Sequence, residues 1–160
     1  MGGNPSSYEF MESDEMARIE KSIEINAPPE EIWKMLYWNR IPEWLDIIKN
    51  AEYTSKERDT VGATAHVVGE AAGIKVEWDV EITEYVKNKS AKWRTTGGNL
   101  TAIGESNLKV TEKGTQLIFI IDSELPYSIL GKIIDKLVVN RESEKGIEKG
   151  LKKLKALLEK

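Results

Sequence analysis

The stretch "INAPPEEIW", residues 25–33, marks an abrupt change in the chain. Before it, residues 17–26 alternate between apolar and polar side chains, which is the pattern of a strand with one face in water. Pro28 and Pro29 end that strand, because proline cannot donate a hydrogen bond to a β-ladder. Proline is well accommodated in the first turn of a helix, and residues 30–37 continue with two glutamates and then apolar residues at helical spacing. The stretch therefore predicts a switch from strand to helix.

A second short helix is expected around residues 41–48, where Pro42 interrupts the pattern. Strand-like segments separated by short turns follow. The clearest is "IKVEWDVEITEY", residues 74–85, in which every second residue from Ile74 to Ile82 is apolar. Short turns between consecutive strands predict an antiparallel meander. The expected strands of this part are 51–55, 62–69, 74–85, 91–97, 100–110 and 115–125.

The last part of the chain, residues 127–160, carries apolar residues at helical spacing and predicts one long helix. A helix of about 30 residues spans about 45 Å, so it must lie across the whole sheet. The sequence thus predicts an α+β fold: a curved antiparallel sheet of about seven strands wrapped around a long C-terminal helix, with two short helices after the first strand. Residues 1–16 have no periodic pattern and are expected to form a flexible arm before a single domain, 17–160.

Composition excludes several kinds of function. The chain of 160 residues has no cysteine and one histidine, His66. A zinc site or a thiol nucleophile is therefore not expected, no Ser-His-Asp set is visible, and we predict neither a metal nor a cofactor. The formal net charge of −4 argues against a nucleic-acid partner. No apolar run approaches the roughly 18 residues of a membrane span. We expect a cytoplasmic protein, because the chain lacks cysteine and an N-terminal signal pattern.

The C-terminal segment 132–160 carries nine basic and five acidic residues. A solvated helix face is the simpler interpretation of such a run. The alternative is a transient contact with an anionic membrane surface or an acidic partner.

Small residues on several of the expected strands, including Ala63, Gly69 and Ser106, suggest a cavity between the sheet and the helix. Large neighbours such as Trp78 and Trp93 could fill that space instead. The candidate ligand-binding residues on the inward face and on the helix are Ala65, Val67, Val76, Trp78, Val80, Trp93, Thr95, Ala102, Gly104, Phe119, Ile121, Ile133, Leu137, Arg141 and Glu144.

Arg141 and Glu144 belong to this set because the inward stripe of the helix, continued from Ile133 and Leu137, becomes polar at Asn140, Arg141 and Glu144. Burying polar side chains costs free energy unless they are hydrogen-bonded to a partner or hydrated. These residues could therefore border the cavity and anchor a polar group of a ligand. Alternatively, the stripe drifts and these residues form a helical ion pair at the rim. Trp33, Trp38 and Trp44, in the two short helices, are expected to close one end of the core or to gate an entrance.

Five segments together resemble the START/polyketide-cyclase superfamily, whose members share the helix-grip fold of the birch-pollen allergen. The resemblance extends over residues 17–160 and rests on "IEKSIEINAPPEEIWKML", "VEWDVEITEY", "AKWRTTGG", "KGTQLIFIID" and "LGKIIDKLVVNRESEKGIEKGLKKLKALLE". It implies the helix-grip fold. Members of the superfamily include lipid and sterol carriers, hormone receptors, quinone-binding proteins, aromatic polyketide cyclases and activators of Hsp90, and they share no common catalytic motif.

Three functions remain open at this point. The first is binding of a small hydrophobic molecule, such as a lipid, isoprenoid, quinone or polyketide-like aromatic, in the internal cavity. The second is a cyclase, dehydratase or hydrolase that uses the same cavity, for which Glu84, Arg141 and Glu144 are the acid–base candidates. The third is an interaction domain like the Hsp90 activators, which predicts a filled core and an exposed patch. The sequence predicts neither the ligand nor the oligomeric state.

Overall fold

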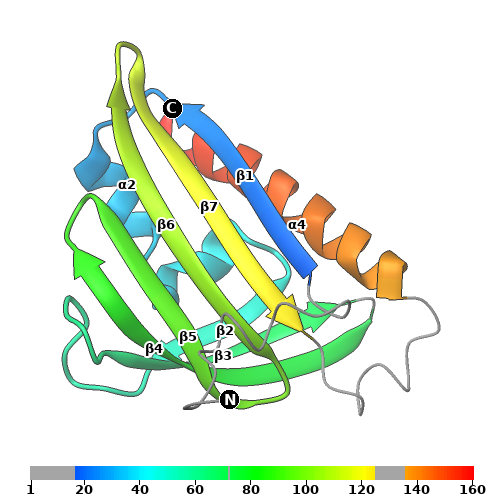
Figure 1. The fold of residues 1–160 in the computed structure, drawn as a ribbon. Helices are drawn as coiled ribbons and strands as arrows, with labels where there is room; N and C mark the ends of the chain where they lie inside the picture. Colours follow the sequence, from blue (N-terminus) through cyan, green and yellow to red (C-terminus); the bar gives the residue numbers. More distant parts are fainter. Residues whose placement is uncertain (1–16, 72, 125–135) are drawn as a thin grey trace, which may run out of the picture.

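The computed structural model describes residues 17–71, 73–124 and 136–160. Its seven strands form a single antiparallel sheet in the order β1-β7-β6-β5-β4-β3-β2, and the first and last strands of the chain lie side by side (Figure 1). The sequence-based prediction of fold class is confirmed. The elements are β1 (Ala17–Ile25), α2 (Pro29–Met35), η1 (Trp38–Glu43), β2 (Ile48–Tyr53), β3 (Thr64–Ala71), β4 (Ile74–Val86), β5 (Ser90–Gly98), β6 (Thr101–Thr111), β7 (Gly114–Glu124) and α4 (Lys136–Leu158).

The predicted switch after the first strand is present. Strand β1 ends at Ile25, and α2 begins at Pro29 with Pro28 as its extended N-cap residue. Glu30 and Glu31 occupy the first turn, where carboxylates suit the helix dipole. The second short helix is the 3-10 helix η1, which contains Pro42 and ends at Glu43, earlier than expected.

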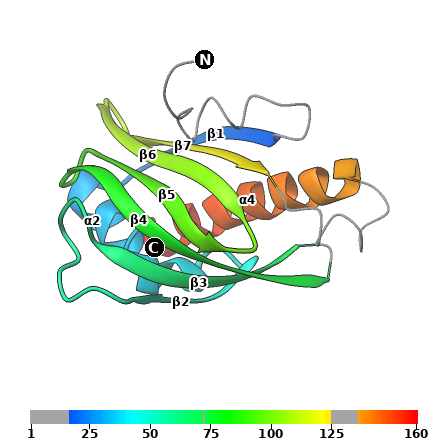
Figure 2. The ribbon, with the colours of Figure 1, turned by 60° about the horizontal axis from the view of Figure 1, so that its bottom comes forward.

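The sheet curls around α4, so that its concave face, α2 and η1 enclose the core (Figure 2). The segment between β1 and β2, residues 26–47, contains α2 and η1 and is called the helical insert below. One buried cluster contains Ile32 and Trp44 from this insert, Val67 and Leu117 from the sheet, and Leu154 from α4. Because every layer contributes apolar side chains, the helical insert belongs to the core and is no surface addition.

Helix α4 is observed over Lys136–Leu158, within the predicted helix of residues 127–160. The earlier part of that prediction, 127–135, lies outside the described residues. In the described portion of the chain, no helix is long and apolar enough to cross a membrane.

Strand β4 departs from strict alternation at one point. Its pairing with β5 shifts between Ile82 and Glu84, so that Thr83 forms an extra residue, a β-bulge. A shift of one residue moves the following side chains to the opposite face of a strand. As a result Tyr85, paired with Ala91, faces the same side as Ile82, and Glu84 faces the other.

Candidate ligand-binding cavity

A cavity of about 180 Å³ lies between the concave face of the sheet, the helical insert and α4. Its walls are mainly apolar and aromatic, with residues from α2, η1, all seven strands and α4. Ligand sites in proteins have this composition, an apolar wall with a few polar groups.

Aromatic rings define the middle of the cavity. Trp38 and Trp93 meet edge to face with their ring centroids 5.3 Å apart. Trp44 and Phe119 meet in the same way at 6.4 Å. Trp44 is fully buried and donates its indole N–H to the Met35 carbonyl at 2.8 Å. These contacts and the hydrogen bond pack the rings against one another in the most apolar part of the cavity wall.

Among the predicted ligand-binding residues, five line the cavity: Val76, Trp78, Trp93, Phe119 and Ile121. Four others are at most 1% exposed and lie in the packed interior without lining the cavity: Ala65, Val67, Val80 and Ala102. All nine stay predictions as ligand contacts.

The small residues of the sheet have a second explanation. A Cβ atom added to Gly104 would lie 2.4 Å from the Trp93 indole, and one added to Gly69 would lie 2.9 Å from the Trp78 ring. Gly104 therefore makes room for an indole and not for the cavity. Thr95 also has a structural role, because its hydroxyl oxygen accepts a hydrogen bond from the Ala102 backbone N–H at 3.1 Å.

Two of the polar residues that were expected to face the cavity from the C-terminal helix, Arg141 and Glu144, do not line it. Glu144 lies at the edge of the sheet, where its carboxylate is 3.3 Å from Lys21 Nζ of β1. Arg141 is exposed and does not line the cavity. Asn140, which the same stripe predicts to face inward, does line the cavity, and Ser143, which the stripe does not predict, lines it as well. Ile133 lies outside the described residues, and the side chain of Leu137 is likewise not described.

Glu84, the third acid–base candidate, is exposed and lies 3.5 Å from Lys92. The β-bulge turns it away from the cavity and turns Tyr85 toward it. Strict alternation could not have identified Tyr85, because the signal for a bulge is not visible in the apolar pattern of residues 74–85.

A polar cluster surrounds Tyr85 at one end of the cavity. Its hydroxyl accepts a hydrogen bond from Trp33 Nε1 at 2.9 Å and donates one to Asp59 Oδ1 at 2.6 Å. Burial, followed by the neighbouring Asp59 carboxylate, raises the pKa of Tyr37 to about 12 and also raises the pKa of Tyr85. Both tyrosines are thus neutral hydrogen-bond donors at physiological pH.

The same end of the cavity carries Arg58, whose guanidinium lies over the ring of Tyr53, 5.0 Å from the ring centroid. The Tyr53 hydroxyl accepts a hydrogen bond from the Trp38 backbone N–H at 3.1 Å. Sequence reasoning treated the Arg58-Asp59 segment only as a turn and so missed both residues.

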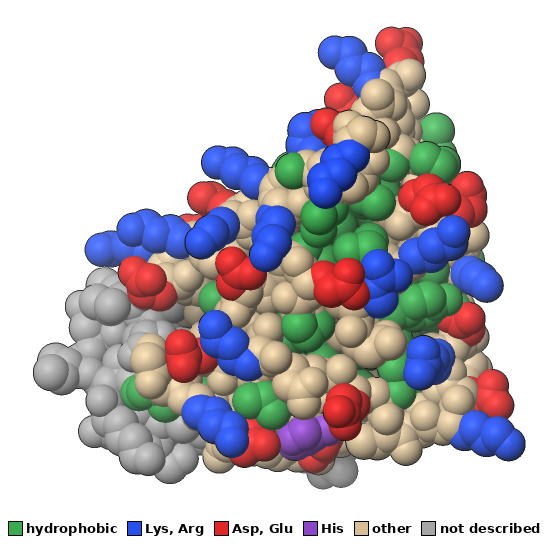
Figure 3. Space-filling view, turned by 180° about the vertical axis from the view of Figure 1, so that it is seen from behind, with side chains coloured by type: hydrophobic (Ala, Val, Ile, Leu, Met, Phe, Trp, Pro, Cys, Tyr) green, Lys and Arg blue, Asp and Glu red, His purple; other side chains and the backbone are tan. Residues whose placement is uncertain are grey.

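His66 faces away from the cavity, as its place in the alternation of β3 predicts. Figure 3 shows it between acidic side chains on the surface. Its ring nitrogens lie 2.8 Å from Asp79 Oδ1 and 3.1 Å from Glu77 Oε1. Within the described ranges, no group of histidine and acidic residues is arranged to hold a metal ion.

Comparison with known proteins agrees with this architecture. A protein of Streptomyces lincolnensis, described as an uncharacterized 17.2 kDa protein in the melC2-rnhH intergenic region, is 26% identical over 132 residues, which cover 82% of this chain and 84% of that one. The crystal structure of a Thermus thermophilus protein matches with a TM-score of 0.73 at 22% identity, over 88% of this chain and 96% of the other. A START superfamily protein from Mycobacterium smegmatis matches with a TM-score of 0.71 at 15% identity, over 89% and 97% of the two chains.

These two structures share the fold with this protein. The resemblance to the START/polyketide-cyclase superfamily is confirmed by a family match. A sequence model of one family matches residues 16–159, nearly the whole chain. The protein belongs to the family described as polyketide cyclase / dehydrase and lipid transport.

Proposed function

We propose that this protein binds a small, largely apolar molecule in the cavity between the sheet and α4. The observation that carries the proposal is the cavity itself, an aromatic-walled space of about 180 Å³. A dry cavity of about 150 Å³ in another protein takes up benzene, so this volume suits a ligand of one or two aromatic rings.

One further observation supports binding. The family to which the chain belongs includes lipid transport in its description.

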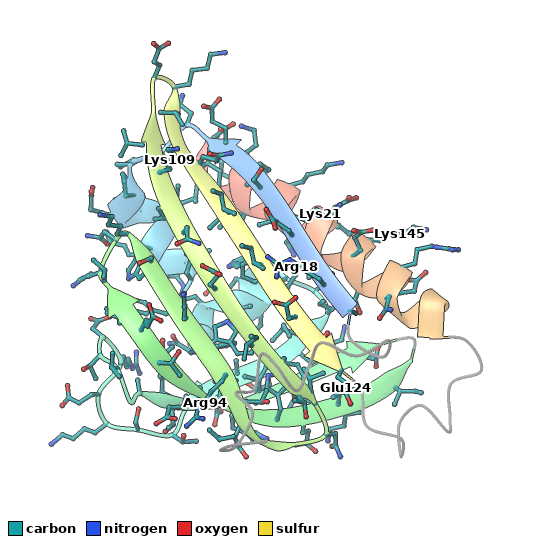
Figure 4. The ribbon with its side chains drawn as sticks, viewed as in Figure 1. Arg18, Lys21, Arg94, Lys109, Glu124 and Lys145 are labelled. Carbon is teal, nitrogen blue, oxygen red and sulfur yellow. The ribbon has the colours of Figure 1, made fainter. Side chains whose placement is uncertain are left out.

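The sheet offers a place where the cavity can be filled by substitution. Ser106 of β6 pairs with Ala91 of β5 on one side and with Phe119 of β7 on the other, and all three line the cavity. Ser106→Leu adds apolar volume at this point. Lys109→Leu is the matched control, because Lys109 is an exposed residue of the same strand on its outer face (Figure 4).

The experiment is isothermal titration calorimetry with 2-naphthamide, a neutral two-ring probe. We expect the wild type to bind with a dissociation constant of about 100 µM or tighter, equivalent to about −5.5 kcal/mol. Ser106→Leu should weaken this binding at least about tenfold, since the ring and the new side chain compete for one volume, and Lys109→Leu should leave it unchanged. Absence of saturable binding to the wild type, or equal binding by Ser106→Leu, would contradict the proposal.

A further inference from the structure

Charged side chains are rare in the cavity wall. Among the described residues that line it, Arg58 and Glu70 are the ones that carry a charge. They lie at opposite ends of β3: Arg58 lies over Tyr53, which pairs with Ala65 near the start of the strand, and Glu70 is next to the last residue of the strand. At about 3.3 Å per residue, the strand between Thr64 and Glu70 separates the two ends by about 20 Å. The cavity is therefore electrically asymmetric.

Within the described ranges, Arg58 forms no ion pair. Arg18, Arg40 and Arg94 each have a carboxylate within 4.0 Å, whereas Arg58 has none among the described residues. Its guanidinium is held over the Tyr53 ring instead. Stacking on an aromatic face orients the guanidinium and leaves its N–H donors available.

The neighbouring acid has other partners. Asp59 accepts the Tyr85 hydroxyl at 2.6 Å and lies 3.8 Å from Lys87 Nζ. These interactions, with the Tyr37 hydroxyl, hold the pKa of Asp59 below its ordinary value against the effect of burial. Counting Arg58, Asp59 and Lys87 together, this end of the cavity keeps an excess of one positive charge. The two other charges of the loop, Lys56 and Glu57, cancel each other.

We propose that Arg58 binds an anionic group of the ligand, so that the molecule carried in the cavity is an apolar ring system with a carboxylate at one end. This inference rests on the proposed function and adds the class of ligand and its orientation. The guanidinium matches a carboxylate with two parallel N–H donors. The rings of the ligand then extend toward Trp38 and Trp93, and Glu70 at the far end disfavours the reverse orientation.

Asp59 is a positioning residue in this arrangement. Its hydrogen bond to Tyr85, which in turn accepts from Trp33, ties the loop between β2 and β3 to the strand and the helical insert. The loop therefore presents Arg58 at the cavity as part of a fixed structure.

The test compares two ligands of nearly equal shape, 2-naphthoate and 2-naphthamide, by isothermal titration calorimetry at neutral pH. We expect the wild type to prefer the anion by about tenfold, because a hydrogen-bonded charge pair contributes about 1.5 kcal/mol or more. Arg58→Gln keeps a polar, though shorter, side chain and removes the charge, and should reduce the preference to about twofold or less while 2-naphthamide binding is retained. Lys56→Gln removes one positive charge from the same loop outside the cavity and should keep the full preference.

The outcomes separate this inference from the proposed function. If the wild type binds 2-naphthamide as well as 2-naphthoate, or if Arg58→Gln keeps the preference, the anion site is refuted and cavity binding stands. Equal loss of preference in Lys56→Gln would refute a specific role of Arg58 and indicate a general charge effect. If neither ligand binds to the wild type, cavity binding itself fails, and the anion site fails with it. Circular dichroism and thermal melts of each variant establish that it is folded.

Discussion

His66 lies on the outer face of the sheet between two carboxylates, each on the neighbouring strand β4. The pKa of His66 is raised, first by its hydrogen bond to Asp79 and then by that to Glu77. A histidine whose pKa is raised on folding stabilises the folded state below its unfolded pKa, about 6.5, and this contribution disappears as the pH rises through the raised value. The side chain is 42% exposed, so solvent screening limits the effect on stability.

The single histidine makes this prediction easy to measure. An NMR titration of the His66 ring should give a pKa above 6.5, and the double variant Glu77→Gln/Asp79→Asn should bring it back toward that value. In urea denaturation, His66→Gln should be less stable than the wild type at pH 6, and the difference should shrink by pH 9. A titration midpoint at or below 6.5 in the wild type would show that the two carboxylates do not act on the ring.

At the level of elements, α4 approaches the segment between η1 and β2 through two glycines. A Cβ atom added to Gly150 would lie 2.7 Å from a Leu45 methyl group and 3.1 Å from the Trp44 carbonyl oxygen, and one added to Gly146 would lie 2.6 Å from Ile47. These glycines are not needed for an unusual backbone conformation, because both lie within the helix. They are needed because the helix and the insert pack closely.

Gly150→Ala should therefore destabilise the protein, although alanine is the better helix former by about 1 kcal/mol. The Trp44 carbonyl is backbone and cannot rotate away, and overpacking typically costs about 1–3 kcal/mol. We expect a net loss of about 1 kcal/mol in the free energy of unfolding, measured by urea denaturation. Lys152→Ala, at an exposed position of the same helix, serves as the control and should change stability by less than about 0.5 kcal/mol. A more stable Gly150→Ala variant would disprove close packing at this site.

At the scale of the whole molecule, the cavity couples ligand binding to folding. Its walls come from the insert, the sheet and α4, so the binding site exists only when these parts are assembled. A ligand that binds only the folded state stabilises it by mass action. The ligand should therefore protect the entire fold against heat, not one element of it.

With 2-naphthoate at about one hundred times its dissociation constant, stabilisation of about 2.7 kcal/mol is expected. For a domain of this size that corresponds to a rise of about 5–10 °C in the melting temperature, measurable by differential scanning calorimetry. Ser106→Leu at the same ligand concentration should show about half of that rise or less, because a tenfold weaker affinity leaves about 1.4 kcal/mol of stabilisation. An unchanged melting temperature in the wild type would argue that the ligand does not bind inside the fold.

The sequence by itself determined the order of the elements and the inward face of most strands. Proline positions, two-residue alternation and helical spacing are local properties, and local properties are readable along the chain. The strand-to-helix switch at Pro28, the apolar face of residues 74–82 and the outward direction of His66 were all predictable for this reason.

The tertiary structure alone decided which residues meet the cavity. The bulge at Thr83 exchanged Glu84 for Tyr85, and the rotation of α4 kept the predicted Asn140 at the cavity but put Ser143 there in place of Arg141 and Glu144. Gly104 proved to lie beneath an indole, and Arg58 came to the cavity on a loop that looked like a simple turn. Each of these depends on strand register, helix rotation or the packing of distant segments, because a cavity is the volume that those contacts leave unfilled.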